Sequence, residues 1–298
     1  MNDRYDRQIR FFGRAGQDRL EQAKIVLLGT GGNGIHVVQQ LTYAGVRRWA
    51  LVEFDIVEDT NLNRLVTATP ADIGAPKTDI AVRIVKAMYP EANPTVIPGK
   101  IGNPDIRHDI RTEFGDADLV IGCFDKEIPR QEAVKLCSEA GVPYLDLATE
   151  ILPGDERGEL EYGGRVVFTF DGSGCPICLG IIDPAELARE QMNDAQRAER
   201  DGLYGLTAEE AGGSGPSVVT INGVVASLAC TEALIYLTGL REPARQLTYL
   251  AHSSVVRKNT TAGNPDCLYC TRWRKAWAGR THPLKDDDTN ADPDTTTS

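Results

Sequence analysis

The chain has little of several residue types that mark specialised classes of protein. Aromatic residues make up only 6% of its 298 residues, and 32 Lys and Arg are outnumbered by 43 Asp and Glu. The resulting net charge of −11 repels a phosphate backbone, so nucleic acid is not an expected partner. No run approaches the ~20 apolar residues of a membrane span, and the starting sequence MNDRYDRQIR is charged where a signal peptide is apolar. We therefore expect a cytoplasmic protein with no membrane partner.

The overall composition is that of a globular protein. Apolar residues make up 41% and charged residues 25% of the chain, and its length suits one large α/β domain or two small ones. Thr and Asp without an apolar period dominate residues 282–298, so a disordered acidic tail is predicted there. The folded part is then one domain of residues 1–281, with a first half at 1–150 and a second half at 151–281.

The first half alternates strand and helix signals. Short apolar runs predict strands at 24–28, 49–54, 95–97, 119–123 and 142–147. Helical spacing predicts helices at 35–44, 76–88 and 128–140. Because the strands show no polar alternation and are separated by helices, a Rossmann-like, mostly parallel sheet with helices on both faces is expected.

The second half has a different pattern. Residues 160–170 and 246–256 predict longer antiparallel strands, which would continue the sheet, and residues 218–238 predict a long buried helix. The polar segment 183–217 ends in GGSGPS and is interpreted as a mobile loop over a site.

A glycine motif follows the first predicted strand. Gly29, Gly31 and Gly34 form GxGxxG, and Glu53 closes the second strand. Such glycines let N–H groups at a helix N-terminus approach phosphate oxygens, and the acid can accept from ribose hydroxyls. Taken alone, the motif indicates an NAD-dependent dehydrogenase, or a tight turn that only packs helix on strand. The motif predicts a nucleotide-binding site but does not identify the nucleotide.

Charged side chains follow the second and fourth strands. Asn61, Arg64 and Lys77 come after Glu53, and Asp125 comes after the fourth strand. Strand ends of a parallel sheet meet at one edge, so these groups could clamp a triphosphate and hold Mg²⁺. Each cation alone is more simply a solvated surface charge. Together they favour a nucleoside triphosphate over a hydride-transfer cofactor, which needs no such clamp.

Four of the seven cysteines form two CxxC pairs, Cys175 with Cys178 and Cys267 with Cys270. Four thiolates predict a closed tetrahedral zinc site of structural rather than catalytic kind. Surface disulfides or redox chemistry are the alternatives, and a reducing cytoplasm disfavours disulfides.

The ordered set of motifs is more specific than any one of them. RYDRQIR, GTGGNG, EFDIVEDTNLNR, GAPK, a CxD sequence and two CxxC pairs resemble the ThiF/MoeB family of E1-like enzymes over about residues 4–275. The resemblance implies an ATP-dependent adenylyltransferase that acts as a homodimer on a ubiquitin-like or sulfur-carrier protein ending in Gly-Gly. The C-terminal carboxylate of that protein would attack the α-phosphorus of ATP, giving an acyl-adenylate and pyrophosphate.

The resemblance also assigns roles to residues. It places Gly29, Gly31, Gly32 and Gly34 under the phosphates, Glu53 on the ribose, Asn61, Arg64 and Lys77 on the phosphates, and Asp125 on Mg²⁺. Arg7 matches an arginine that reaches across the homodimer to the partner's ATP, although without the resemblance it would be a charged residue of a frayed N-terminus. The reaction needs positive charge and in-line placement rather than a base, because the attacking carboxylate is ionised at pH 7.

The chain departs from its relatives in the loop that crosses over the adenylate. Many members carry a thioester-forming cysteine there, but no cysteine lies between Leu179 and Ala229. Ser214 and Ser217 are the closest hydroxyls. Either the adenylate passes to a sulfur donor or another acceptor, such as a downstream protein, or a serine forms an oxyester. The first option is favoured because serine is a poor nucleophile without a base.

Other functions remain open at this level. One is a ThiF-like enzyme that adenylates a peptide, a small-molecule carboxylate or a modified tRNA nucleoside. Another is an NAD-dependent oxidoreductase. A third is the inactive half of a heterodimeric E1, which would have no need of Arg64, Lys77 and Asp125.

Overall fold

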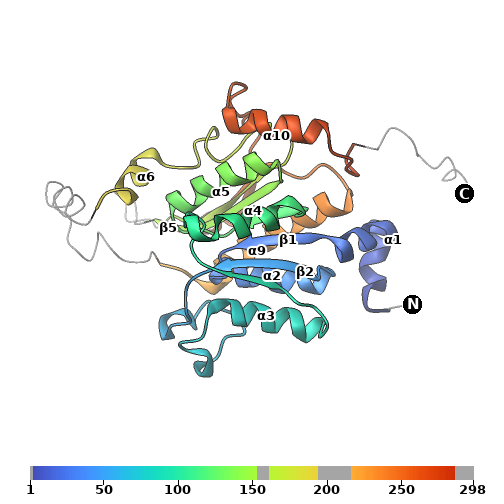
Figure 1. Cartoon of the computed structure of the whole chain (residues 1–298), viewed down its shortest axis with the longest axis vertical. Helices are drawn as coiled ribbons and strands as arrows, with labels where there is room; N and C mark the ends of the chain where they lie inside the picture. Colours follow the sequence, from blue (N-terminus) through green and yellow to red (C-terminus); the bar gives the residue numbers. More distant parts are fainter. Residues whose placement is uncertain (1–2, 153–160, 194–215, 286–298) are drawn as a thin grey trace, which may run out of the picture.

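A computed structural model describes residues 3–152, 161–193 and 216–285. They form an eight-stranded sheet in the order β3-β2-β1-β4-β5-β6-β7-β8, with helices on both faces (Figure 1). Strands β1 to β5 pair in parallel, whereas β6, β7 and β8 pair antiparallel. The predicted Rossmann-like sheet with an antiparallel continuation is therefore confirmed.

The strands are β1 (Lys24–Leu28), β2 (Arg48–Glu53), β3 (Thr95–Pro98), β4 (Leu119–Gly122), β5 (Tyr144–Leu152), β6 (Glu161–Thr169), β7 (Gln246–Leu250) and β8 (Val255–Lys258). The helices are α1 (Asp6–Gln22), α2 (Gly32–Ala44), α3 (Lys77–Met88), α4 (Arg107–Gly115), α5 (Glu127–Ala140), α6 (Pro184–Glu190), α9 (Val219–Thr238) and α10 (Leu268–Ala278).

Two hydrophobic cores lie on opposite faces of the sheet. Helices α1, α2, α3 and α9 cover one face, and α4, α5 and α10 cover the other (Figure 1). Successive residues of β1 alternate between the cores, since Ile25 and Leu27 belong to the first and Val26 and Leu28 to the second. A strand buried on both faces has no polar alternation, which is why these strands were readable as continuous apolar runs.

Helix α9 is long and apolar enough, with a mean hydropathy of 1.5, to cross a membrane by length and composition. Polar residues, among them Asn222 and Glu232, interrupt its apolar sequence. Half of the helix is buried inside the protein, where it packs against α2, α1 and strands β5 and β6. Its apolar character is accounted for by its place in the larger core.

Some predictions of secondary structure were wrong. The single strand predicted at 246–256 is a hairpin of β7 and β8, joined by a short helical turn at Ala251–Ser253. Ser254, with a φ of 56°, completes the reversal in the left-handed region, and the polar run His252–Ser254 marks where the apolar pattern breaks. Helices α1, α4 and α10 were not predicted from the sequence.

The predicted loop and tail are only partly covered. The segment 183–217 begins with α6, whose N-terminus is capped by the Asp183 side chain, and residues 194–215 lie outside the described residues. The tail was predicted to be disordered from residue 282, but the ring of His282 stacks on Tyr236 with centroids 4.2 Å apart. Because residues 282–285 pack on the core in this way, only the prediction for 286–298 stays untested, and those residues are not described.

Candidate nucleotide-binding site and metal centre

The glycine loop lies between the ends of β2 and β4. Gly29 has a φ of +92°, and a Cβ there would come within 2.9 Å of the carbonyl oxygen of Cys123. A Cβ on Gly34 would lie 2.0 Å from the carbonyl oxygen of Gly29. Both positions therefore require glycine, one for its backbone conformation and one for the close approach of α2 to β1.

Glu53 holds this loop in place. Its buried carboxylate accepts hydrogen bonds from the N–H groups of Thr30 at 2.8 Å, Phe54 at 2.8 Å and Asp55 at 3.1 Å. The Thr30 hydroxyl donates a fourth at 3.3 Å. A carboxylate has about four acceptor positions, so a ribose hydroxyl would have to replace one of these donors. Ribose binding by Glu53 stays a prediction, and the structure adds a second role in fixing the loop to β2.

Arg64 lies directly beside the glycine loop. A Cβ on Gly32 would lie 3.4 Å from its Cδ, and its guanidinium donates to the carbonyl oxygen of Thr60 at 2.7 Å and to Asn63 at 3.0 Å. These partners are neutral, and Arg64 has no carboxylate partner within the described part of the chain. Its charge is therefore available to an anion on the loop.

Lys77 and Asn61 both have hydrogen-bond partners within the protein. Lys77 begins α3 and its ammonium group donates to Asp55 at 2.9 Å. The buried side chain of Asn61 accepts from the N–H of Glu58 at 3.3 Å, which closes the turn that leads to Arg64. Their contacts with phosphate stay predictions, but both lie in the connection from β2 to α3, at the edge where the glycine loop lies.

Asp125 is exposed on the loop between β4 and α5. Two residues earlier, the N–H of Cys123 donates to the carbonyl oxygen of Leu28 at 2.9 Å, so this loop leaves the sheet next to the glycine loop. Among residues 3–152, 161–193 and 216–285, Asp125 makes no hydrogen bond or ion pair. Its carboxylate is free to bind a hard cation such as Mg²⁺.

A buried ion pair that was not predicted from the sequence stabilises the loop between β4 and α5. Nε of Arg130 lies 3.1 Å from both carboxylate oxygens of Asp146, and another guanidinium nitrogen donates to the carbonyl oxygen of Phe124 at 2.8 Å. Burial by itself lowers the pKa of Arg130, but the carboxylates of Asp146 and Glu127 outweigh it and raise the pKa. One signal for this pair in the sequence is the aspartate inside the apolar strand YLDL.

Helix α6 also contacts the end of the loop between β4 and α5. The two carboxylate oxygens of Glu190 accept from the N–H groups of Glu127 and Ile128, each at 2.8 Å. Glu190 therefore caps the N-terminus of α5 immediately after Asp125 and Lys126, where a negative charge is favourable. This contact joins the segment after Cys178 to the loop of the candidate magnesium ligand.

The two candidate acceptor serines differ in what can be said of them. Ser214 lies outside the described residues. Ser217 accepts a hydrogen bond from the side-chain amide of Asn222 at 3.0 Å. An amide is not a base, so this contact does not activate the hydroxyl for attack.

Arg7 lies far from the glycine loop of its own chain. It is exposed near the start of α1, where the neighbouring Gln8 donates to the carbonyl oxygen of Ala44 at 2.6 Å. Ala44 ends α2 and Gly32 begins it, and a helix of 13 residues spans about 20 Å. An arginine side chain does not bridge that distance, so any contact of Arg7 with nucleotide has to be made in another subunit.

The four predicted metal ligands come together. The sulfur atoms of the four cysteines Cys175, Cys178, Cys267 and Cys270 all lie within 4.8 Å of one another, and neighbouring pairs are 3.6–3.8 Å apart. Zinc at about 2.3 Å from each sulfur of a tetrahedron requires about 3.8 Å between sulfurs. These cysteines are free thiols rather than disulfides, and a hydrogen bond from Cys270 lowers the pKa of Cys175 to about 6. The donor set fits a closed, structural zinc site.

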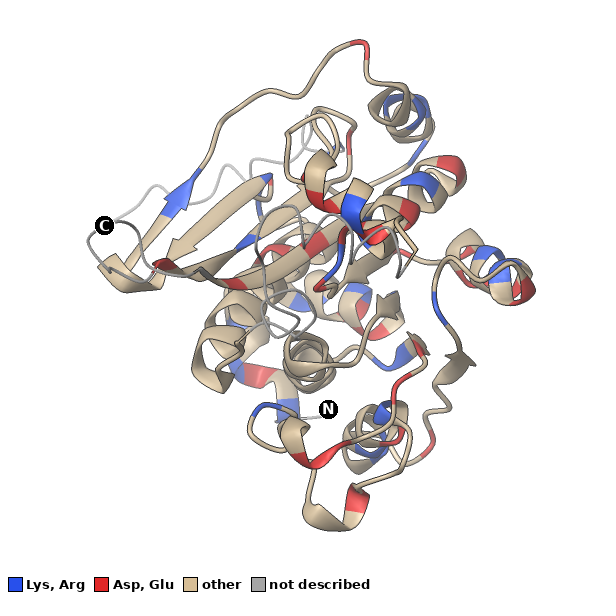
Figure 2. Ribbon diagram, turned by 90° about the vertical axis from the view of Figure 1, so that its left-hand side faces the viewer, with Lys and Arg blue, Asp and Glu red and all other residues tan. Residues whose placement is uncertain are grey.

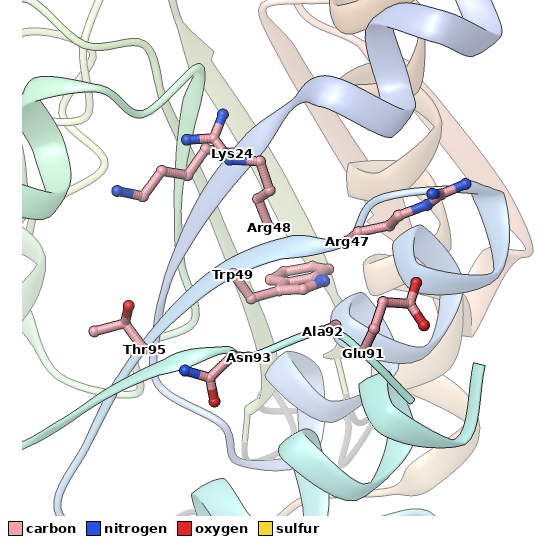
Figure 3. Close-up of a pocket in the computed structure, with 8 residues that line it drawn as sticks. All are labelled: Lys24, Arg47, Arg48, Trp49, Glu91, Ala92, Asn93 and Thr95. Carbon is pink, nitrogen blue, oxygen red and sulfur yellow. The ribbon is translucent and has the colours of Figure 1, made fainter. Parts of the chain in front are cut away.

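Charged groups elsewhere are mostly paired locally. Figure 2 shows basic and acidic segments interspersed over the helices. A cavity of about 420 Å³ at the opposite edge of the sheet is lined by Lys24, Arg47, Arg48 and Trp49, among others. The three cationic head groups point in different directions (Figure 3) and each has a carboxylate partner. This cavity is therefore a poor anion site compared with the glycine loop.

The fold and the site together define a class of protein. A glycine turn at the switch point between β1 and β4, a cation beside it and an acid after β4 are the features of a Rossmann-like nucleotide-binding protein. More particularly, the chain belongs to the ThiF family, whose model matches residues 5–269.

Several relatives of known activity are similar over most of their length. The molybdopterin-synthase adenylyltransferase of Escherichia coli is 29% identical over 272 residues, covering 90% of this chain and 95% of that protein. The sulfur carrier protein adenylyltransferase of Thermus thermophilus is 30% identical over 286 residues, covering 90% of each. The crystal structure of Escherichia coli MccB shares the fold, with a TM-score of 0.69 and 21% identity over 91% of this chain and 74% of that chain.

Proposed function

We propose that the protein is an ATP-dependent adenylyltransferase that activates the C-terminal glycine carboxylate of a ubiquitin-like or sulfur-carrier protein. One observation carries the proposal. The guanidinium stem of Arg64 packs on Gly32 of the phosphate-binding turn, and Arg64 has no carboxylate partner in the described part of the chain. A positive charge left open beside such a turn suits a triphosphate better than a dinucleotide. The similarity to two adenylyltransferases over 90% of this chain supports the same reading.

The reaction balances without a proton transfer. A carboxylate oxygen of the partner forms a bond to the α-phosphorus of ATP, the bond from that phosphorus to the bridging oxygen breaks, and pyrophosphate leaves. Arg64 and Lys77 stabilise the negative charge that grows on the leaving pyrophosphate. Asp125 would hold Mg²⁺, which when bound neutralises phosphate charge. Backbone N–H groups at the start of α2 bind the α-phosphoryl group.

The active unit in this proposal is a homodimer. Arg7 lies at the far end of α2 from its own glycine loop, so its charge serves the site of the partner subunit. Arg7→Ala and Lys77→Ala should each abolish activity. Mixed dimers of the two variants then contain one intact site, and random pairing restores roughly a quarter of wild-type activity. A mixture that stays inactive while forming mixed dimers would remove the shared-site model.

The acyl-adenylate is passed to an external acceptor in this proposal. Ser217 is hydrogen-bonded to the Asn222 amide, which offers no base, and the crossing segment contains no cysteine. A sulfur donor or a downstream acceptor protein therefore takes the acyl group. The zinc would be structural, and the seven free cysteines suit the reducing cytoplasm.

ATP–pyrophosphate exchange tests the function. Purified protein is incubated with MgATP, labelled pyrophosphate and each of a panel of small proteins ending in Gly-Gly, and the same proteins lacking the last glycine serve as controls. Exchange that needs the intact Gly-Gly end is the expected result. Exchange driven only by a short peptide or small carboxylic acid would shift the substrate class, and reduction of NAD without exchange would overturn the proposal.

A further inference from the structure

A buried asparagine lies against the glycine loop. Asn222 is 2% exposed and lies in the first turn of the mostly apolar helix α9. A Cβ on Gly32 would lie only 2.5 Å from the Nδ2 atom of Asn222. The same imaginary Cβ would lie 3.4 Å from Arg64. Gly32 is thus flanked by the Asn222 amide and by the stem of Arg64.

A chain of hydrogen bonds sets the orientation of this amide. The side-chain amide of Asn33 donates to the hydroxyl of Thr149 at 3.5 Å. That hydroxyl has one proton, which it donates to Oδ1 of Asn222 at 3.0 Å. The oxygen of the Asn222 amide therefore faces Thr149, and its nitrogen faces Gly32.

One N–H of the amide is left for a ligand. Nδ2 of Asn222 donates to the hydroxyl of Ser217 at 3.0 Å, and an amide nitrogen has two protons. The second N–H has no acceptor among residues 3–152, 161–193 and 216–285. A buried donor without an acceptor costs about 1–3 kcal/mol, so an oriented and buried N–H beside the loop points to an acceptor that the protein binds there.

We propose that Asn222 is a catalytic residue that donates this N–H to a non-bridging oxygen of the α-phosphoryl group during adenylation. The inference rests on the proposed function. Arg64 and Lys77 come from the connection after β2, so pyrophosphate leaves toward that side of the loop. In-line attack then brings the carboxylate from the opposite side, where Thr149 lies on β5 and α9 begins.

Because the Asn222 amide is held in a fixed orientation, its N–H can stabilise the transition state. The α-phosphorus carries five oxygens as the new bond forms and the old one breaks, and negative charge grows on its non-bridging oxygens. Thr149 and Ser217 hold the amide so that it needs no reorientation as that charge appears. Asn222 thus complements Arg64, which faces Gly32 from the leaving-group side.

Substitutions at Asn222 and Thr149 separate a catalytic donor from a structural one. Asn222→Leu removes the donor and keeps the number and branching of the side-chain heavy atoms. We expect its pyrophosphate-exchange kcat, measured with a Gly-Gly sulfur-carrier protein, to fall about 100-fold, while the Kd for MgATP changes less than about threefold. Ser227→Ala, which removes a hydroxyl from the exposed face of the same helix, is the matched control and should leave both quantities unchanged.

Thr149 supplies a second test if Asn222→Leu does not fold. Thr149→Val frees the amide to rotate and should lower kcat about tenfold, whereas Thr149→Ser keeps the hydroxyl and should restore it. The inference is overturned if kcat is unchanged in folded Asn222→Leu, if MgATP affinity falls as much as kcat, or if Thr149→Val equals Thr149→Ser. A wild-type protein that binds MgATP but exchanges no pyrophosphate would instead refute the proposed function, and the role of Asn222 with it.

Discussion

The glycine-loop edge and the four-cysteine centre differ in whether their polar groups have partners within the protein. In the cysteine centre, each sulfur lies within 4.8 Å of the other three, an arrangement in which all four thiolates would bind one zinc ion and leave no open position for a substrate. At the glycine loop, Arg64 and Asp125 have no oppositely charged partner in the described part of the chain, and one N–H of Asn222 has no acceptor there. The comparison indicates that the cysteine centre serves stability, whereas the glycine loop keeps groups available for a ligand.

The same division exists within the nucleotide edge. Glu53 and the Arg130–Asp146 pair form their hydrogen bonds within the protein, and they hold the two loops that carry the open groups. Preorganisation of this kind lowers the cost of binding and of the transition state. The open groups are therefore expected to control activity, and the satisfied groups to control stability.

Loss of the metal centre is expected to have the largest effect. Cys178→Ser should lose bound zinc and lower Tm by at least about 10 °C, because structural zinc contributes on the order of 10 kcal/mol. Metal analysis and calorimetry measure both. Cys137→Ala, which changes a buried cysteine outside the centre, is the control. An unchanged Tm after complete metal loss would show that the cysteine centre does not serve stability, contrary to its proposed difference from the glycine loop.

Removing the candidate magnesium ligand should affect activity without stability. Asp125→Asn keeps the shape of an exposed side chain but removes its charge, and we expect pyrophosphate exchange to fall about 1,000-fold with Tm within about 1 °C. Lys86→Ala, at the exposed far end of α3, should change neither. A large drop in Tm for Asp125→Asn would show that this carboxylate supports the fold instead.

Breaking the buried ion pair should show the opposite behaviour. Asp146→Ala leaves the Arg130 guanidinium, 2% exposed, with Glu127 but without its fully buried carboxylate partner, and should lower the free energy of unfolding by about 3 kcal/mol. Urea unfolding measures this loss. The exposed pair of Arg111 and Glu139 is the matched control, since Glu139→Ala should cost less than about 1 kcal/mol. Equal costs would mean that burial does not set the value of these pairs.

The smallest effect concerns the residues after α10. Burial against Tyr236, aided by the nearby charge of Arg280, lowers the pKa of His282 from 6.5 to about 4. The unfolded chain therefore takes up a proton between pH 6.5 and 4 that the folded protein does not, and stability is lost as the pH falls through that window. His282→Phe keeps the stacked ring without titrating. Its Tm should fall by about 1–2 °C less than that of the wild type between pH 7 and 5, and identical pH profiles would contradict this.

Much of the parallel half was predictable because its signals are local. Strands buried on both faces give continuous apolar runs, and a glycine such as Gly29 with a φ of +92° must follow where the chain turns under a helix. The hairpin of β7 and β8 was missed because the polar run His252–Ser254, which forms its turn, is only three residues long and contains no glycine or proline. Asp146 and Arg130 were not paired in advance because one lies on a strand and the other on a helix 16 residues away.

The candidate site was predicted by residue type and only partly by role. Arg64 and the four cysteines lie where the motifs indicated. Glu53 and Asn61 turned out to hold backbone as well. Asn222 was not predicted, because the polar residues of α9 are scattered and have no spacing to interpret. Only its contact with Gly32 in the tertiary structure points to the proposed role.

By itself, the amino-acid order determined the phosphate-binding turn, the two metal-ligand pairs and the alternation of strands and helices. Each depends on backbone conformations and spacings within a few residues. The tertiary structure decided which groups remain open, that Asn222 faces Gly32, and that Arg7 lies an entire helix away from its own loop. Such placements depend on the order of strands in the sheet and on the packing of segments up to about 190 residues apart, which local forces do not specify.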